Sequence, residues 1–279
     1  MNPIFEISSL QNPKVKKALS LFDRRDRDEE GLFLIEGYRE LSRAVDKGIV
    51  IQNLFYCNDL FLGENEPSLI LRIQKQGGDL FSCTEPVLRK ISYRDRPDGL
   101  VAIAVQMKRS FGEFASLLKS KPNPFLLIAE SIEKPGNLGT ILRSCDAVGV
   151  DGVVVCDRCT DIYNPNVVRA SVGTLFTQPV IEAIGSETIL WLQKNKVQIL
   201  ASSPHATVEF TEVDLTGPVA IVVGTEQVGL TEKWLQVADL KVRIPMRGVA
   251  DSLNVATATT LLLYEVLRQR TKKGIFPWM

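Results

Sequence analysis

The sequence predicts an α/β protein of two domains, the second of which carries a largely parallel sheet. Three observations favour this fold class. Short apolar runs alternate with amphipathic segments along most of the chain, which is typical of strands that alternate with helices. The 279 residues suffice for two domains of ordinary size, each with its own core. The run KPNP at residues 121–124 interrupts the alternation near the middle, which indicates a boundary.

The first part of the chain, residues 1–30, is expected to be an exposed basic arm. A short helix is predicted over residues 13–22, and the mixed-charge run of residues 23–30 follows it. Within residues 1–27 there are six basic residues against three acidic ones. This local excess of positive charge suits contact with phosphate groups.

A small α/β domain is predicted for residues 31–108, because strand-like runs and helical patterns alternate throughout this segment. The following residues, 109–123, contain a short amphipathic stretch and are expected to form a linker. The expected strands are 32–35, 54–56, 80–83 and 100–105, and the expected helices are one that ends at residue 47, one at 69–76 and one that begins after residue 84.

A larger α/β domain is predicted for residues 124–279. Its strand-like runs are continuously apolar, which indicates strands buried on both faces of a parallel sheet. Ligands of such sheets bind at the carboxyl ends of the strands, so the loops after the strands are candidate sites. The expected strands are 125–129, 152–156, 197–201, 219–223 and 242–244, and the expected helices are 138–148, 186–195, 231–238 and 255–270.

The composition disfavours several classes of protein. Hydrophobic residues at 45% and charged residues at 24% are ordinary for a globular chain. No apolar run approaches the roughly 18 residues of a membrane span, and no secretory signal is apparent, so we expect a cytoplasmic protein with no membrane partner. The five cysteines favour free thiols over a disulfide framework. Cys156 and Cys159 lack a second ligand pair, and His205 is the single histidine, so we expect no metal.

The net charge is zero, which by itself argues against a nucleic-acid-binding protein. Its distribution weakens that objection, because residues 241–279 contain seven basic residues against two acidic ones. Such a local excess attracts phosphate groups even in a neutral molecule. Solvated surface charge remains an alternative reading of any one of these side chains.

The first candidate functional segment is EKPGNLGTILR at residues 133–143. Apolar residues recur at helical spacing over residues 138–148, which leaves Asn137 at the helix entrance as a natural N-cap and Arg143 on another face. A purely structural alternative remains open, in which Asn137 only caps the helix and Arg143 pairs with Asp146.

The second segment is GTEQVGL at residues 224–230, directly after a predicted strand. Gly224 lets a ligand approach the backbone closely, and a loop that enters a helix offers free amide donors. Glu226 suits a cationic ligand, although an acidic residue near a helix start also compensates the helix dipole. The dinucleotide fingerprint and the phosphate loop do not occur in order.

The third segment is IPMRGVADSLN at residues 244–254, which leads into a long apolar helix. Proline and glycine after a strand end, beside another glycine-bearing loop, suit a pocket that holds a flat ligand by main-chain contacts. Alternatively, Ser252 or Asn254 is only the N-cap of the following helix.

Taken together and in this order, the three segments resemble the motifs of the SpoU (TrmH) family of RNA ribose 2′-O-methyltransferases, within the SPOUT superfamily. The resemblance covers about residues 124–270, and residues 164–165 and 169–173 also fit the family pattern. The matching motif positions are Asn137, Gly139 and Arg143 in the first segment, Gly224, Glu226 and Gly229 in the second, and Ile244, Pro245, Met246, Gly248, Ser252, Leu253 and Asn254 in the third.

The resemblance implies a fold, a cofactor and a substrate. It implies a parallel sheet whose C-terminal segment is threaded into a deep trefoil knot, and a homodimer with the active site near the subunit interface. S-adenosylmethionine would bind in a bent form, largely through the main chain. Residues 32–105 resemble a ribosomal-protein-like substrate-binding domain, which favours ribosomal RNA over transfer RNA. The cofactor-binding residues implied are Gly224, Ile244, Met246 and Leu253.

The resemblance also assigns catalytic and RNA-binding roles. Arg143 is expected at the target nucleotide as base or phosphate anchor, and because arginine stays protonated in proteins, its placement is the firmer expectation. Arg169 is expected to contact RNA as well. A non-catalytic RNA-binding or ribosome-assembly protein is the main rival, and a dehydrogenase is disfavoured by the missing fingerprint. The remaining catalytic residues implied are Asn137, Glu226, Ser252 and Asn254.

Overall fold

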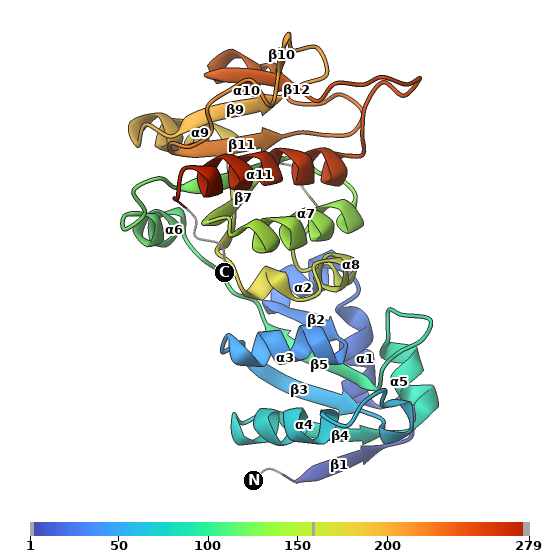
Figure 1. Ribbon diagram of the computed structural model, residues 1–279. Coiled ribbons are helices and arrows are strands. Elements are labelled where there is room, and N and C mark those ends of the chain that lie inside the picture. Colours follow the sequence, from blue (N-terminus) through green and yellow to red (C-terminus); the bar gives the residue numbers. More distant parts are fainter. Residues whose placement is uncertain (1–2, 158–159, 276–279) are drawn as a thin grey trace. The chain divides into compact units, whose positions relative to one another are not determined.

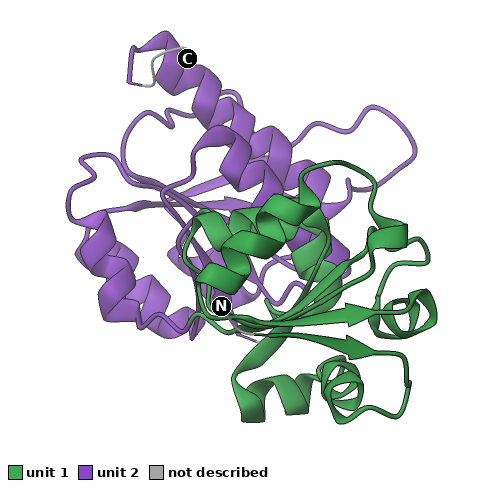
Figure 2. Ribbon diagram, turned by 90° about the horizontal axis from the view of Figure 1, so that it is seen from below, with its two compact units in different colours: residues 1–107, 161–177 green, residues 108–160, 178–279 purple. Residues whose placement is uncertain are grey.

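The computed structural model describes residues 3–157 and 160–275, which divide into two compact units (Figure 2). Unit 1 comprises residues 1–107 and 161–177, and unit 2 comprises residues 108–160 and 178–279. Strands and helices alternate in both units, and the larger sheet is parallel, which confirms the predicted fold class.

Unit 1 is built on a five-stranded mixed sheet in the order β1-β4-β3-β5-β2. β1, β4 and β3 are parallel, whereas β5 is antiparallel to both of its neighbours. Apolar side chains of α1 and α5 pack on this sheet and form the core of the unit. The strands are β1 (Ile4–Ile7), β2 (Leu32–Glu36), β3 (Ile51–Tyr56), β4 (Asp79–Cys83) and β5 (Leu100–Val105), and the helices are α1 (Pro13–Ser20), α2 (Arg24–Glu30), α3 (Tyr38–Asp46), α4 (Glu66–Lys75), α5 (Glu85–Ile91) and α8 (Pro165–Ala170).

The expectation of an exposed arm over residues 1–30 is wrong for the described residues. Ile4–Ile7 form the edge strand β1, and Asp23 caps helix α2 with its side chain. Arg27 of α2 is only 1% exposed, and its guanidinium donates hydrogen bonds of 2.7 and 2.8 Å to the buried carboxylate of Asp161. The burial of Arg27 cannot be predicted from the charged run of residues 23–30, because the carboxylate that neutralises it comes from a distant part of the sequence.

Residues 161–177 pack in unit 1, although the predicted boundaries placed them in the second domain. The rings of Tyr163 and Phe176 lie 4.6 and 5.9 Å from the ring of Phe33 in β2, measured between centroids. The alternation of strands and helices does not indicate that this segment belongs to the other unit, because in the sequence it lies between two strands of unit 2 like an ordinary connection.

Unit 2 is built on a seven-stranded sheet in the order β10-β12-β9-β11-β6-β7-β8, and all of its strand pairs are parallel. Side chains of α6, α9 and α10 pack on one face, whereas α7 and α11 lie side by side on the other (Figure 1). The strands are β6 (Phe125–Glu130), β7 (Gly152–Cys156), β8 (Val180–Ala183), β9 (Gln198–Ser202), β10 (Val208–Glu209), β11 (Val219–Val223) and β12 (Leu240–Arg243), and the helices are α6 (Phe111–Leu118), α7 (Pro135–Val148), α9 (Gly185–Lys194), α10 (Glu232–Val237) and α11 (Val255–Lys272).

Most of the expected linker, residues 109–123, is the folded helix α6. Ser110 and Glu113 form a capping box at its start, and Phe114 and Leu118 are buried in the core of unit 2. The amphipathic stretch noted in the sequence is therefore part of the domain. The trefoil knot implied by the resemblance stays a prediction.

Two further findings concern membrane spans and metal sites, which the sequence disfavoured. Within residues 3–157 and 160–275, no helix is long and apolar enough to cross a membrane. The same residues contain no group of three or more His, Cys, Asp or Glu side chains placed to hold a metal ion. Cys156 is a free, buried thiol, and Cys159 lies outside the described residues.

Candidate functional site

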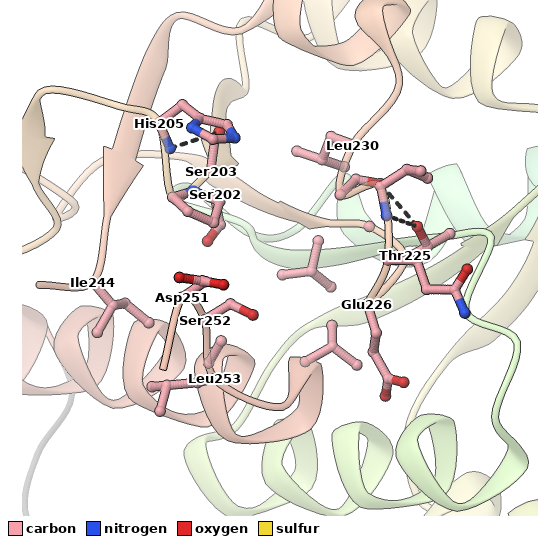
Figure 3. Close-up of a pocket in the computed structure, with 18 of the residues that line it drawn as sticks. Ser202, Ser203, His205, Thr225, Glu226, Leu230, Ile244, Asp251, Ser252 and Leu253 are labelled. Carbon is pink, nitrogen blue, oxygen red and sulfur yellow. Dashed lines mark hydrogen bonds between the residues drawn. The ribbon is translucent and has the colours of Figure 1, made fainter. Parts of the chain in front are cut away.

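A cavity of about 340 Å³ opens at the carboxyl ends of β9, β11 and β12 in unit 2 (Figure 3). These strands are neighbours in the sheet, so the loops that follow them converge on one place. Three segments supply most of the lining, namely residues 202–205 at the end of β9 and after it, 223–230 at the end of β11 and after it, and 244–253 after β12. The second and third segments coincide with two of the segments singled out in the sequence.

The β11 loop forms one wall of the cavity and folds back on itself. The amides and carbonyls of Thr225 and Gly229 exchange two hydrogen bonds of 3.0 Å, and Gly229 has a φ of +70°. A Cβ atom on Gly224 would lie 2.3 Å from the carbonyl oxygen of Gly229. Only glycine fits at residue 224 without a backbone shift, because the returning strand of the loop passes directly over it.

All four residues expected to bind the cofactor line this cavity: Gly224, Ile244, Met246 and Leu253. The apolar side chains among them can contact the faces of a flat ring, and the loop backbone offers amides and carbonyls at its edge. Asp251 also lines the cavity, on the side that faces Ser202 in Figure 3, and its carboxylate has no hydrogen bond or ion pair with any residue the structure describes.

This donor set fits S-adenosylmethionine. The cofactor combines a flat adenine ring with a net positive charge, carried by its sulfonium and ammonium groups against one carboxylate. Apolar walls suit the ring, and the carboxylate of Asp251, which pairs with no described residue, suits the positive charge.

A polar cluster at the edge of the cavity joins the three motifs. The Asn254 side-chain Nδ2 lies 3.2 Å from Oδ1 of Asn137 and 3.5 Å from Oε1 of Glu226, and donates to both. Its Oδ1 accepts the amides of Ala256 and Thr257 and so caps helix α11. Asn254 therefore connects the start of α11 with the start of α7 and with the β11 loop.

Lys134 completes this cluster. Its ammonium lies 2.5 Å from the carboxylate of Glu226, and the hydrogen bond to Glu226, reinforced by the negative charge, raises the pKa of Lys134. Lys134 is therefore a cation at neutral pH and compensates Glu226, which leaves Asp251 as the carboxylate available to a positively charged ligand.

The expectation that Asn137 caps α7 is wrong, because the helix begins at Pro135 and Asn137 lies within its first turn. The side chain of Asn137 instead accepts from Asn254, and its buried Nδ2 has no hydrogen-bond partner among the described residues. A buried amide donor without a partner is costly, so this atom is a candidate contact for a bound ligand.

Among the described residues, the remaining expected site residues make no hydrogen bond to this cluster. Ser252 lines the cavity. Arg143 lies on the exposed surface of α7, outside the cavity lining, and has no ion pair with Asp146 or with any other residue in the described ranges. Arg169 belongs to unit 1, on α8.

Several lining residues were missed in the sequence, among them Ser202, Ser203 and His205 after β9. Their strand was predicted, and the general rule that ligands bind at the carboxyl ends of parallel strands would have pointed to them. The pairing of Lys134 with Glu226 had no local signal, because the two residues lie in different segments.

Comparison with known proteins identifies the family. Residues 124–264 match the model of the SpoU rRNA Methylase family, and residues 12–102 match that of the MRM3-like substrate binding domain. A 23S rRNA uridine 2′-O-methyltransferase of Streptomyces viridochromogenes is 28% identical, over 90% of this chain and 87% of its own. The S-adenosylmethionine-bound rRNA methyltransferase of Sinorhizobium meliloti has a TM-score of 0.85 at 31% identity and covers 95% of this chain and 98% of its own.

A further solved structure, an RNA 2′-O ribose methyltransferase, is 40% identical with a TM-score of 0.84, over 95% of this chain and 99% of its own. The matches therefore extend over both units and over nearly the full length of each relative. The three motifs, the parallel sheet and these similarities agree: the chain belongs to the SpoU rRNA methylase family.

Proposed function

We propose that this protein transfers the methyl group of S-adenosylmethionine to the ribose 2′-hydroxyl of a nucleotide in ribosomal RNA. The observation that carries the proposal is the contact of Asn254 with Asn137 and Glu226 beside the cavity, because it brings one residue of each motif together. The names of the relatives support both the reaction and the substrate.

In this proposal the loops after β11 and β12 hold the cofactor. Gly224 permits the close return of the β11 loop that shapes this wall of the cavity, while Ile244, Met246 and Leu253 contact the cofactor through apolar atoms and the main chain. Asp251 offers the negative charge that complements the cationic cofactor. When bound, S-adenosylmethionine supplies an electrophilic methyl group on a positively charged sulfur atom.

The residues of the chain must then place the ribose hydroxyl in line and help to remove its proton. The hydroxyl of Ser252 and the Nδ2 of Asn137, which has no partner in the described part of the chain, are suited to orient the ribose. We assign Arg143 to a phosphate of the target nucleotide, because its guanidinium is exposed and unpaired among the described residues and arginine stays protonated in proteins.

The experiment that tests this proposal measures methyl transfer from labelled S-adenosylmethionine to ribosomal RNA from cells that lack the gene. We expect Arg143→Ala to lower kcat by at least about 100-fold, the effect of misplacing a reacting group. The Kd for S-adenosylmethionine should change less than about twofold, because Arg143 lies outside the cavity lining. Arg143→Lys keeps the charge and is expected to retain part of the activity.

Three outcomes would contradict parts of the proposal. Unchanged turnover of Arg143→Ala would remove this residue from the mechanism. Methyl transfer to transfer RNA alone would show that the substrate is transfer RNA and not ribosomal RNA. If the wild-type protein binds ribosomal RNA but transfers no methyl group to it, the protein is a non-catalytic RNA-binding or ribosome-assembly factor.

The same proposal includes a homodimer that acts in the cytoplasm. Helix α11 exposes 40% of Leu261 and 48% of Tyr264, and large apolar side chains on one helix are typical of a surface that a second subunit covers. Size-exclusion chromatography with light scattering should give twice the mass of the chain. The substitution Leu261→Glu should shift it toward the monomer; a monomeric wild-type protein would refute the dimer.

A further inference from the structure

Unit 1 carries an exposed aromatic ring with an arginine over it, and no acidic residue among those the structure describes pairs with that arginine. Tyr93 is 46% exposed, and the guanidinium carbon of Arg169 lies 5.9 Å from the centre of its ring. The ring of Phe22 lies 6.4 Å from Tyr93 and is inclined to it by 22°. The three side chains come from separate parts of the sequence and meet on one surface of the unit.

Buried acidic residues hold Tyr93 in place. The carboxylate of Glu36, at the end of β2, accepts the backbone amide of Tyr93 at 2.7 Å and that of Arg94 at 3.3 Å. The Arg94 guanidinium donates to Glu40 of α3 at 2.7 Å and to Asp98 of the same loop at 3.5 Å, so its charge is compensated. The loop that carries Tyr93 is therefore fixed to the start of α3, while the aromatic ring of Tyr93 stays exposed to solvent.

Arg169 is anchored to the same place. Gly173, three residues after α8, has a φ of +78°, and a Cβ atom on it would lie 3.0 Å from Cα of Glu40. Arg43 of α3 donates a hydrogen bond to the carbonyl of Val172. These close contacts fasten the segment that carries Arg169 against α3, from which Glu40 also holds the Tyr93 loop.

The charge of Arg169 stays available to a ligand. Its guanidinium donates to the side-chain amide of Asn166 at 2.7 Å, and among the residues with described positions no carboxylate pairs with it. Arg96, three residues after Tyr93, is likewise exposed and has no ion pair within that set. A ring held by its loop and a planar cation over that ring thus form one preorganised surface.

We propose that Tyr93 and Arg169 form a stacking platform for an unpaired base of the RNA substrate, and that Arg169 also contacts the adjoining phosphate. Unpaired bases stack on tyrosine rings and guanidinium planes, and an uncompensated arginine attracts the phosphate backbone. Bases within a duplex are stacked on their neighbours and are not free to bind in this way. The inference rests on the proposed function, because it assumes an RNA substrate.

The test uses a single-stranded oligoribonucleotide with one 2-aminopurine, and the same strand paired in a duplex. Stacking on Tyr93 should quench the fluorescence of the single strand, and Tyr93→Ala should weaken its binding about tenfold, within the range for loss of one stacked base. Tyr93→Phe keeps the ring and should bind as the wild type does. Arg169→Lys keeps the charge without the plane and should bind less well than the wild type.

Phe5→Ala is the matched control, because Phe5 is also 46% exposed in unit 1 and its ring also stacks on another, that of Phe81. We expect this variant to bind the oligonucleotide as the wild type does. Equal losses in Tyr93→Ala and Phe5→Ala, or no loss in either, would overturn the platform. Equal affinity for the duplex and the single strand would overturn it as well.

Kinetics separate this inference from the function on which it rests. In methyl transfer to ribosomal RNA, Tyr93→Ala should raise KM for the RNA about tenfold and leave kcat within about twofold, because the residue binds substrate in unit 1 and is not in the cavity. An active wild type with an unchanged KM in the variant refutes the platform alone. An inactive wild type refutes the proposed function.

Discussion

The substitution Gly224→Ala tests whether the folded-back β11 loop forms the cofactor site. The added methyl group would lie 2.3 Å from the carbonyl oxygen of Gly229 and 2.6 Å from the amide nitrogen of Leu230. Both distances are far inside the roughly 3.5 Å at which non-bonded atoms attract. Both atoms belong to the backbone, so no side chain can rotate away, and the loop itself must move.

The cost can be worked from the contacts that such a movement breaks. The two reciprocal hydrogen bonds between Thr225 and Gly229 each contribute roughly 1 kcal/mol, and crowding a packed site costs roughly another 1–3 kcal/mol. We expect the free energy of unfolding to fall by about 3–5 kcal/mol. A loop displaced by about 1 Å also narrows the cavity, so we expect the affinity for S-adenosylmethionine to fall at least about tenfold.

Calorimetric titration with S-adenosylmethionine and urea denaturation measure the two effects. Gly112→Ala is the matched control in the same unit, because the nearest atom to its added methyl group is 3.9 Å away and the residue lies within helix α6. Alanine should leave the affinity unchanged there and stabilise the protein by up to about 1 kcal/mol. Normal affinity and stability of Gly224→Ala would refute the steric reasoning.

Three further predictions concern single contacts. Asn254→Ser should keep the cap of α11 and cost less than about 0.5 kcal/mol of stability, because serine also caps helices. It should lower kcat at least about tenfold, because the serine side chain cannot reach Asn137. Normal turnover would show that Asn254 has no role in the site. Arg27→Leu and Asp161→Leu should each lower the free energy of unfolding, measured by urea denaturation, by about 3–5 kcal/mol. The double variant should lose less than the sum of the two single losses, and additive losses would show that the two side chains are not coupled. Burial raises the pKa of Cys156 to about 12, so at pH 8 Cys156 in the folded protein should resist a thiol reagent, and rapid labelling would contradict its burial. Because the thiol ionises more readily in the unfolded chain, this group should lower the free energy of unfolding only above about pH 9.

Periodic patterns predicted the elements that carry the site. The strand at residues 219–223 and the helices that became α7 and α11 were found because each buries a regular set of apolar side chains. The loops after the strands followed from the general geometry of parallel sheets. The motif residues were then identified by resemblance, and the structure brings Asn137, Glu226 and Asn254 into contact.

The expectations that proved wrong concern residues whose partners lie far away in the sequence. Arg27 is indistinguishable from an exposed charge until Asp161 is placed beside it. Strand β1 has three exposed residues out of four and, among the described strands, pairs with β4 alone, so its sequence lacks the pattern of a buried strand. Local spacing contains no information on such pairings, which arise only when the sheet assembles.

Asn254 shows that one side chain can both cap a helix and take part in a functional site. An asparagine side chain has an acceptor and a donor. In this chain Oδ1 closes the start of α11, while Nδ2 contacts Asn137 and Glu226. The cap fixes the rotation of the amide, and a fixed amide holds its donor at a defined place between two motifs. The helix start thus positions the site, and for this reason a residue that only caps should preserve the fold and lose the activity.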